Sequence, residues 1–227
     1  MNARVNSLIG FGAGGSGGAA LEFTVHATVD SGGGNITVPA DVADGDLGIL
    51  VEGGYQTPSV TTPYTGWNQA GLYTYSVYNR SAIYYKKLTT ADQSTTLTTF
   101  AGTSPGYDGA ILIVLRPNKD LGTIGTGNWD ADGSTGAADV TTGMSSDVQY
   151  ERLYIGGSYV VNVSTEHRLD PDNSPYDFEE EAIGANEYVG CQGKVYLTDV
   201  YGGTVTGNNG ASSAFNAGMS FYFKFNI

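Results

Sequence analysis

The sequence is poor in cysteine, in basic residues and in long apolar runs. Its single cysteine, Cys191, cannot form an internal disulfide, so the simplest expectation is folding in a reducing cytoplasm. Only ten residues are Lys or Arg, and no cluster of them resembles a nucleic-acid groove. No apolar run approaches the ~20 residues of a membrane-spanning helix, and after Phe11 glycines replace the apolar core of a signal peptide. We therefore expect no binding to nucleic acid and no insertion into a membrane.

The residues that are abundant point to a β protein. The 227 residues include 34 glycines and 16 tyrosines, and 23 acidic against 10 basic residues give a formal net charge of −13. Charged residues make up only 15% of the chain, so it lacks the Glu, Lys and Arg that helical proteins use heavily. This composition excludes a helix bundle or coiled coil and indicates an all-β fold.

A two-residue hydrophobic period marks the strands from Glu22 onward. In the first of them, Phe23, Val25, Ala27 and Val29 alternate with polar residues, which predicts that these four share one buried face. Further strands are expected at residues 35–39, 47–52, 73–78, 82–88, 95–100, 109–116, 152–163, 187–200 and 214–227. The pattern predicts a single antiparallel β-sandwich of jelly-roll type.

Two of these strands have a definite expected place. Residues 109–115 are apolar on both faces, which predicts a central strand between a second sheet and either a loop or a neighbouring subunit. In the last strand, Phe221, Phe223, Phe225 and Ile227 share one face, so this strand must be paired and covered.

Two segments fall outside the strand pattern. Residues 1–21 form a glycine-rich N-terminal arm, and the sandwich domain spans residues 22–227. Within that domain, residues 118–150 have little periodicity and are expected to form a long loop.

That loop contains the sharpest local pattern in the sequence. Oxygen-bearing side chains stand at positions 1, 3, 5, 7 and 12 of a twelve-residue stretch, with glycine at position 6, which is the spacing of a calcium loop. The residues are Asn128, Asp130, Asp132, Ser134 and Asp139. Position 12 is Asp where Glu is usual, and these residues are also common in ordinary turns, which is the preferred interpretation. Calcium is the only cofactor that the sequence suggests.

No catalytic constellation stands out. The chain has two histidines, His26 and His167, and no G-x-S-x-G nucleophile motif. Carboxylates are numerous between residues 170 and 181, but a run of three glutamates is usually a solvated stretch. We expect no catalytic residues and no enzyme activity, with a polysaccharide-degrading enzyme that uses two carboxylates as an alternative.

Aromatic and apolar residues are the candidates for an interface. Seven Tyr and Trp residues crowd residues 64–85, and alternation along a strand implies that some of them point outward. Such side chains stack on sugars or bury at protein contacts, and we favour a protein interface. The candidates are Leu8, Ile9, Phe11, Trp67, Tyr73, Tyr75, Tyr84, Tyr85 and Trp129.

Several motifs resemble a known group of proteins. Residues 38–51, Gly66-Trp67, residues 81–88 and residues 108–116 together resemble a loose group of virion structural proteins of tailed bacteriophages, and residues 7–12 look like the start of such proteins. The resemblance covers about the first 117 residues. It implies β-sandwich particle proteins without cofactors, assembled in the bacterial cytoplasm and released by lysis.

The expected function follows from this resemblance and from the composition. We expect a non-enzymatic virion protein that decorates or cements the capsid, contacts the major capsid protein or other virion proteins, and forms a homo-oligomer, for which a trimer is one option. Its net negative charge suits a place on the outer surface of the particle better than contact with packaged DNA. The alternative is a tail-tip or tail-fibre module that binds a host-surface glycan or receptor.

Overall fold

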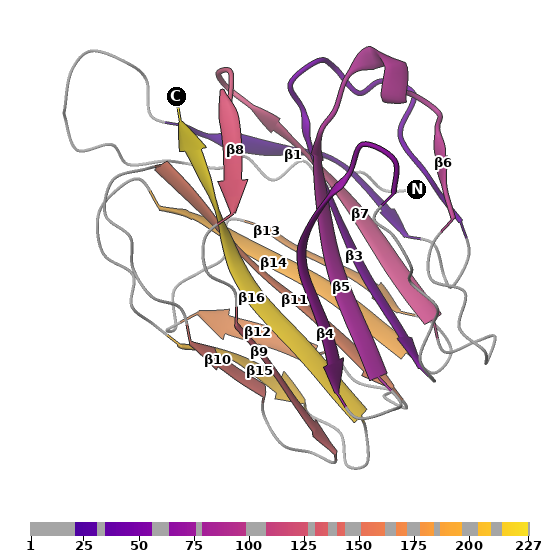
Figure 1. Ribbon diagram of the computed structural model, residues 1–227, viewed down its shortest axis with the longest axis vertical. Helices are drawn as coiled ribbons and strands as arrows, with labels where there is room; N and C mark the ends of the chain where they lie inside the picture. Colours follow the sequence, from indigo (N-terminus) through magenta and orange to yellow (C-terminus); the bar gives the residue numbers. More distant parts are fainter. Residues whose placement is uncertain are drawn as a thin grey trace.

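The part of the chain that the computed structural model describes consists mostly of antiparallel strands (Figure 1). The structure describes residues 21–30, 35–55, 64–75, 79–98, 108–126, 130–135, 140–143, 151–161, 167–171, 178–183, 187–196, 204–209 and 215–226. Beyond residue 126, side chains are described only for Phe223 and Phe225. The predicted all-β antiparallel class is confirmed. Jelly-roll connectivity, which is a finer assignment, stays a prediction.

Two large sheets form the body of the molecule. The five-stranded sheet consists, in spatial order, of β1 (Phe23–Asp30), β7 (Asp108–Pro117), β3 (Leu47–Tyr55), β5 (Asn79–Lys87) and β4 (Asn68–Tyr75). The six-stranded sheet consists of β13 (Phe178–Ile183), β14 (Glu187–Tyr196), β11 (Glu151–Val161), β16 (Phe215–Asn226) and β8 (Thr123–Thr126), with β9 (Asp130–Thr135) also paired to β16.

Two smaller sheets complete the fold. One consists of β10 (Val140–Gly143), β15 (Thr204–Asn209) and β12 (His167–Pro171). The other is the short pair of β2 (Ile36–Thr37) and β6 (Thr96–Leu97). The helical element of the described chain is the single 3-10 turn η1 (Thr90–Asp92), and no helix in that part is long and apolar enough to cross a membrane.

The two large sheets lie face to face, with their strands crossing at an angle (Figure 1). Their shared core joins residues of β1, β3, β5 and β7 to Phe223 and Phe225 of β16. The rings of Phe223 and Tyr85 lie 4.8 Å apart, and those of Phe225 and Phe23 lie 5.6 Å apart. This arrangement agrees with the predicted sandwich, and it covers the last strand on the face that carries Phe223 and Phe225.

The other face of the five-stranded sheet is covered by the chain itself. Residues 35–46, 64–67 and 88–98 form this cover. Ile36, Val38, Val42, Trp67, Leu88 and Leu97 from the cover pack on Leu50, Ala82, Tyr84, Ala110, Leu112 and Val114 from the sheet. The central place predicted for residues 109–115 is therefore confirmed, because that strand is paired on both sides and buried on both faces.

Both edge strands of this sheet contain a β-bulge. The register of β1 shifts between Val25 and Ala27, and that of β4 shifts between Gln69 and Gly71. A bulge changes which face the following side chains occupy. Phe23 and Val25 accordingly belong to the inner core, whereas Ala27 packs on the outer core. The expectation that the four apolar residues of this strand share a face is wrong.

The segment predicted as a long loop is partly a sheet. Within residues 118–150, strands β8, β9 and β10 pair with β16 or β15. Pairing with a distant strand supplies backbone hydrogen bonds that local hydrophobic periodicity does not reveal. The N-terminal arm, up to residue 20, lies outside the described residues.

Candidate functional site

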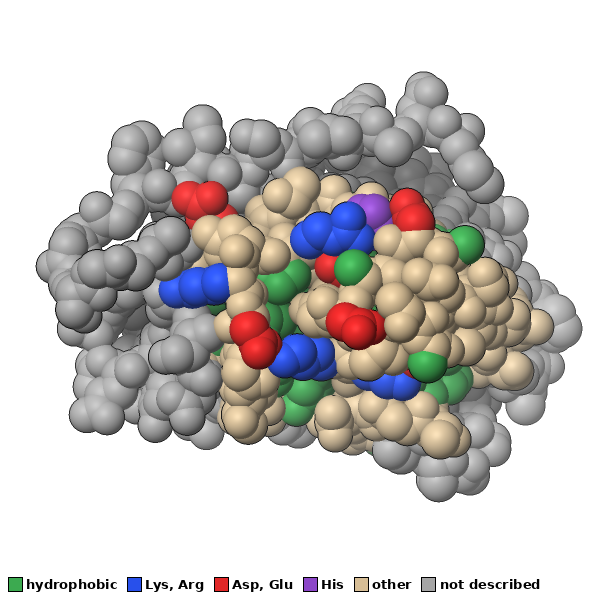
Figure 2. Space-filling model, turned by 90° about the horizontal axis from the view of Figure 1, so that it is seen from above, with side chains coloured by type: hydrophobic (Ala, Val, Ile, Leu, Met, Phe, Trp, Pro, Cys, Tyr) green, Lys and Arg blue, Asp and Glu red, His purple; other side chains and the backbone are tan. Residues whose placement is uncertain are grey.

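Charged residues gather at one end of the five-stranded sheet, where β5 and β7 end and β1 begins. Figure 2 looks onto this end and shows acidic and basic side chains interspersed around a hollow with hydrophobic side chains at its bottom. Every basic residue whose side chain is described lies here: Lys86, Lys87, Arg116 and Lys119. We call this region the charged end.

A charge clasp between Asp46 and Arg116 ties the cover to the end of β7. The Asp46 carboxylate is 2% exposed and accepts hydrogen bonds from Arg116 Nε at 2.9 Å and Nη2 at 2.8 Å. It also accepts one from the backbone N–H of Ala43 at 2.8 Å. Burial by itself raises the pKa of Asp46, but these hydrogen bonds and the nearby positive charge outweigh burial and hold it below its ordinary value.

The turn that carries Asp46 is closed by backbone bonds to the end of β5. The N–H of Gly45 donates to the Leu88 carbonyl at 2.9 Å, and the N–H of Leu88 donates to the Asp46 carbonyl at 2.7 Å. Gly45 has a φ of +98°, a conformation that favours glycine. Beside this turn, His26 Nε2 on the β1 bulge lies 3.2 Å from Asp41 Oδ1. The bulge, the turn and the strand end are thus linked by polar contacts.

A second ion pair attaches Lys86 to the cover. Its Nζ lies 2.6 Å from Asp92 Oδ1, and the other oxygen of Asp92 accepts the backbone N–H of Thr89 at 2.9 Å. Burial raises the pKa of Asp92, while the hydrogen bonds from Lys86 and Thr89 lower it and prevail. This carboxylate therefore caps the η1 turn and neutralises Lys86.

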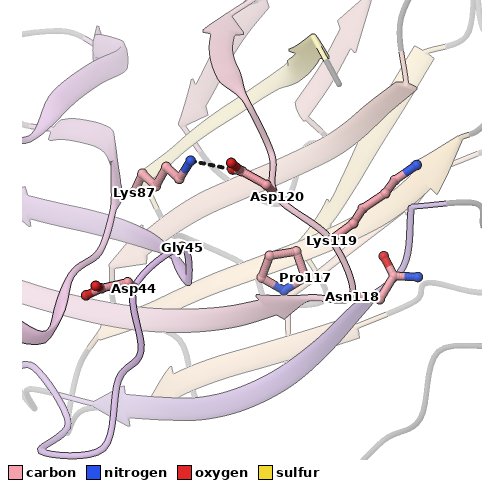
Figure 3. Close-up of a pocket in the computed structure, with 7 residues that line it drawn as sticks. All are labelled: Asp44, Gly45, Lys87, Pro117, Asn118, Lys119 and Asp120. Carbon is pink, nitrogen blue, oxygen red and sulfur yellow. Dashed lines mark hydrogen bonds and ion pairs between the residues drawn. The ribbon is translucent and has the colours of Figure 1, made fainter.

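The hollow lies between the turn that carries Asp46 and residues 117–120, which lead from β7 to β8. It has a volume of about 400 Å³ and is lined by Asp44, Gly45, Lys87, Pro117, Asn118, Lys119 and Asp120. Figure 3 shows Lys87 and Asp120 facing each other, joined by an ion pair of 2.5 Å. Asp44 and Lys119 stand on opposite sides of the hollow and point away from that pair.

The polar groups of the hollow do not converge on a common point. Lys87 and Asp120 pair with each other, and Asp44 accepts the backbone N–H of Thr90 at 2.6 Å. A small-molecule site usually presents a few polar groups toward its ligand from several sides. The arrangement suits a contact with another surface of mixed charge better than the enclosure of a substrate.

A polar cluster is also buried on the outer face, under residues 64–67. Glu52 of β3 is fully buried, and the hydroxyl of Tyr64 donates a hydrogen bond to its Oε1. The Tyr64 ring meets the Tyr84 ring edge-on, with centroids 5.4 Å apart. Burial and the neighbouring Glu52 carboxylate raise the pKa of Tyr64, so this hydroxyl stays protonated and acts as a donor. The hydrogen bond from Tyr64 to Glu52 attaches the cover to the sheet.

The aromatic interface candidates whose side chains are described are mostly core residues. Trp67, Tyr84 and Tyr85 are 5%, 0% and 8% exposed, and Tyr73 is partly buried against the inner core. Tyr84 and Tyr85 point to opposite faces, and both faces are covered, so neither supplies the exposed aromatic surface that we expected. The side chain of Tyr75 and residues Leu8, Ile9, Phe11 and Trp129 lie outside the described part.

The candidate calcium ligands are placed only in part. Asp130, Asp132 and Ser134 lie on β9, an extended strand paired with β16, and not in a coiled loop. Asn128 and Asp139 lie outside the described residues. Among the described residues there is no group of three or more His, Cys, Asp or Glu side chains that could hold a metal. Calcium binding stays a prediction, for which the extended backbone gives no support.

Sequence patterns alone missed the charged end. Asp46 and Arg116 are 70 residues apart, and Lys87 and Asp120 are 33 apart. The available signal was that Lys86 and Arg116 each follow directly on an apolar run, which predicts a strand end but not the partner of the basic residue. Comparison with protein-family models, curated proteins and solved structures found no match.

Proposed function

We propose that this chain is a non-enzymatic structural protein of a tailed-bacteriophage virion, and within that class a capsid decoration or cement protein. The observation that carries the proposal is the resemblance of about the first 117 residues to such proteins. The structural roles of the motifs support it. Residues 38–47 form the clasped turn, Trp67 fills the outer core, and residues 108–116 form the doubly buried strand.

The edges of the five-stranded sheet also support an assembly role. An open edge strand is a template for uncontrolled pairing with other chains, and a bulge is one device that blocks such pairing. Both β1 and β4 carry a bulge. A protein displayed at high copy number benefits from closed edges, because its contacts are then confined to other surfaces.

The net charge of −13 favours the outside of the particle. Packaged DNA repels an acidic protein, whereas an acidic outer surface keeps particles apart and in solution. The partner in this proposal is the major capsid protein or another virion protein, and assembly takes place in the host cytoplasm.

The test is the copy number of this chain in purified particles, measured by quantitative mass spectrometry against the major shell protein. A ratio near one, or near one in three, supports decoration or cementing. A handful of copies per particle rejects decoration and moves the chain to the tail, where binding of a host-surface glycan or receptor is the next hypothesis. Absence from particles rejects the structural proposal.

A further inference from the structure

We propose that two copies of this chain associate through the charged end, with hollow facing hollow. The partner is a second copy, and the contact is isologous. The same surface is used on both copies, so a pair formed across the two-fold axis occurs twice. This contact does not depend on a place in a virion. Loss of self-association would leave the particle proposal standing, and absence from particles would leave this contact standing.

Charge is the first argument. Copies with a net charge of −13 repel each other over most of their surface. At the hollow, however, Lys87 and Lys119 balance Asp44 and Asp120. Two copies therefore approach with less repulsion through this end than through an average patch of an acidic surface.

The placement of the charges is the second argument. Asp44 and Lys119 stand on opposite sides of the hollow and point away from its central ion pair (Figure 3). A two-fold axis that passes between them brings Asp44 of one copy opposite Lys119 of the other, and the reverse pair forms by symmetry.

Other surfaces of the five-stranded sheet are closed, which is the third argument. Its inner face meets the second sheet, its outer face is covered, and both edge strands are bulged. The chain also enters the fold here, because Asn118 accepts the N–H of Glu22 at 3.1 Å and donates to its carbonyl at 3.0 Å.

Sedimentation velocity of the full chain tests the contact. We expect a dimer at physiological ionic strength, where the repulsion between the two net charges is screened beyond about 8 Å while ion pairs in direct contact persist. The discriminating experiment swaps charges. One variant makes the end acidic (Lys87→Glu, Lys119→Glu) and the other makes it basic (Asp44→Lys, Asp120→Lys). Each alone should bind itself at least about tenfold more weakly than wild type, and a mixture should form a heterodimer.

Controls place charge on the exposed Thr96 and Thr98 of the cover. Thr96→Glu with Thr98→Glu matches the charge change of Lys119→Glu, and Thr96→Lys with Thr98→Lys matches that of Asp44→Lys. These should leave self-association unchanged. A wild-type chain that stays monomeric at every salt concentration would overturn the proposal. So would a mixture that does not associate, or controls that weaken association as much as the variants. Circular dichroism checks folding, and if a double variant unfolds, Lys119→Glu mixed with Asp44→Lys makes the same test.

Discussion

The two faces of the five-stranded sheet are held by different kinds of interaction. The inner face meets a second regular sheet through apolar side chains, as where Ile113 packs in one core with Phe223. The outer face meets irregular segments, whose backbone groups need their own partners. There, a few specific contacts recur: Trp67 over Gly48, Tyr64 on Glu52, and Arg116 on Asp46. The difference teaches that specific residue contacts hold an irregular cover in place, whereas a large area of buried apolar surface holds two packed sheets together.

The largest expected effect comes from the outer face, with Trp67→Ala. Trp67 is 5% exposed and packs with Leu50 and Tyr84 in the outer core. Removal of a buried Trp side chain leaves a cavity and costs about 3–5 kcal/mol. Urea denaturation followed by circular dichroism measures the change. A loss below about 1 kcal/mol would mean that the cover does not depend on this anchor.

The next largest effect concerns the clasp and has a pH signature. Asp46→Asn weakens two hydrogen bonds from Arg116, which costs about 1.5–3 kcal/mol at neutral pH. Burial raises the pKa of Asp46, but Arg116 and the Ala43 N–H lower it below its ordinary 3.8. Its stabilisation is therefore present above that value and is lost as pH falls through the folded-state pKa.

The measurement is the free energy of unfolding at neutral pH and at several acidic pH values. The wild type should lose stability more steeply than Asp46→Asn as the pH falls through the acidic range. The variant should keep a smaller dependence of stability on pH, because the pKa of Asp92 is also lowered. Asp120→Asn is the control, because its carboxylate is 77% exposed. Parallel pH curves for wild type and Asp46→Asn would contradict the role given to the clasp.

A smaller effect is expected on the outer face at Gly48, which lies under Trp67. A Cβ at this position would lie 2.9 Å from Cη2 of Trp67 and 3.2 Å from the Leu88 side chain. Overpacking of this kind costs about 1–3 kcal/mol. In a double-mutant cycle, Gly48→Ala should cost less when Trp67 is already Ala, because the closest contact is gone. Additive losses would show that Gly48→Ala destabilises the protein through the backbone and not through a clash with Trp67.

The smallest expected effect is on the inner face, with Ile113→Val. Ile113 is fully buried between the sheets. Loss of one methylene costs about 0.5–1.5 kcal/mol, and the two apolar layers share the adjustment. Differential scanning calorimetry measures the shift in Tm. A loss as large as that of Trp67→Ala would erase the difference between the two faces.

Strand positions could be predicted from sequence because alternation is local. Residues 47–52 and 109–116 appear as β3 and β7, and Phe223 and Phe225 are buried as their alternation implies. Faces were harder. His26 lies in the register shift of β1, so Ala27 turns outward although it continues the two-residue period. A bulge is set by the partner strand, which a local pattern does not contain.

The candidate site was the least predictable part. Tyr84 and Tyr85 were expected at an interface because adjacent strand residues point to opposite faces, and both faces proved to be covered. The charged end depends on residues such as Lys87 and Asp120, which meet only when β5 and the segment after β7 come together. Long-range pairing of this kind follows from topology and not from spacing along the chain.

The amino-acid sequence by itself determined the all-β class, the location of the principal strands and the acidic character of the chain, because these depend on composition and on neighbours two residues apart. The tertiary structure alone decided which face each strand buries, which segments cover the sheet, and which charges meet at its end. Those outcomes depend on register and on contacts between residues far apart in the sequence, and a shift of one residue reverses them.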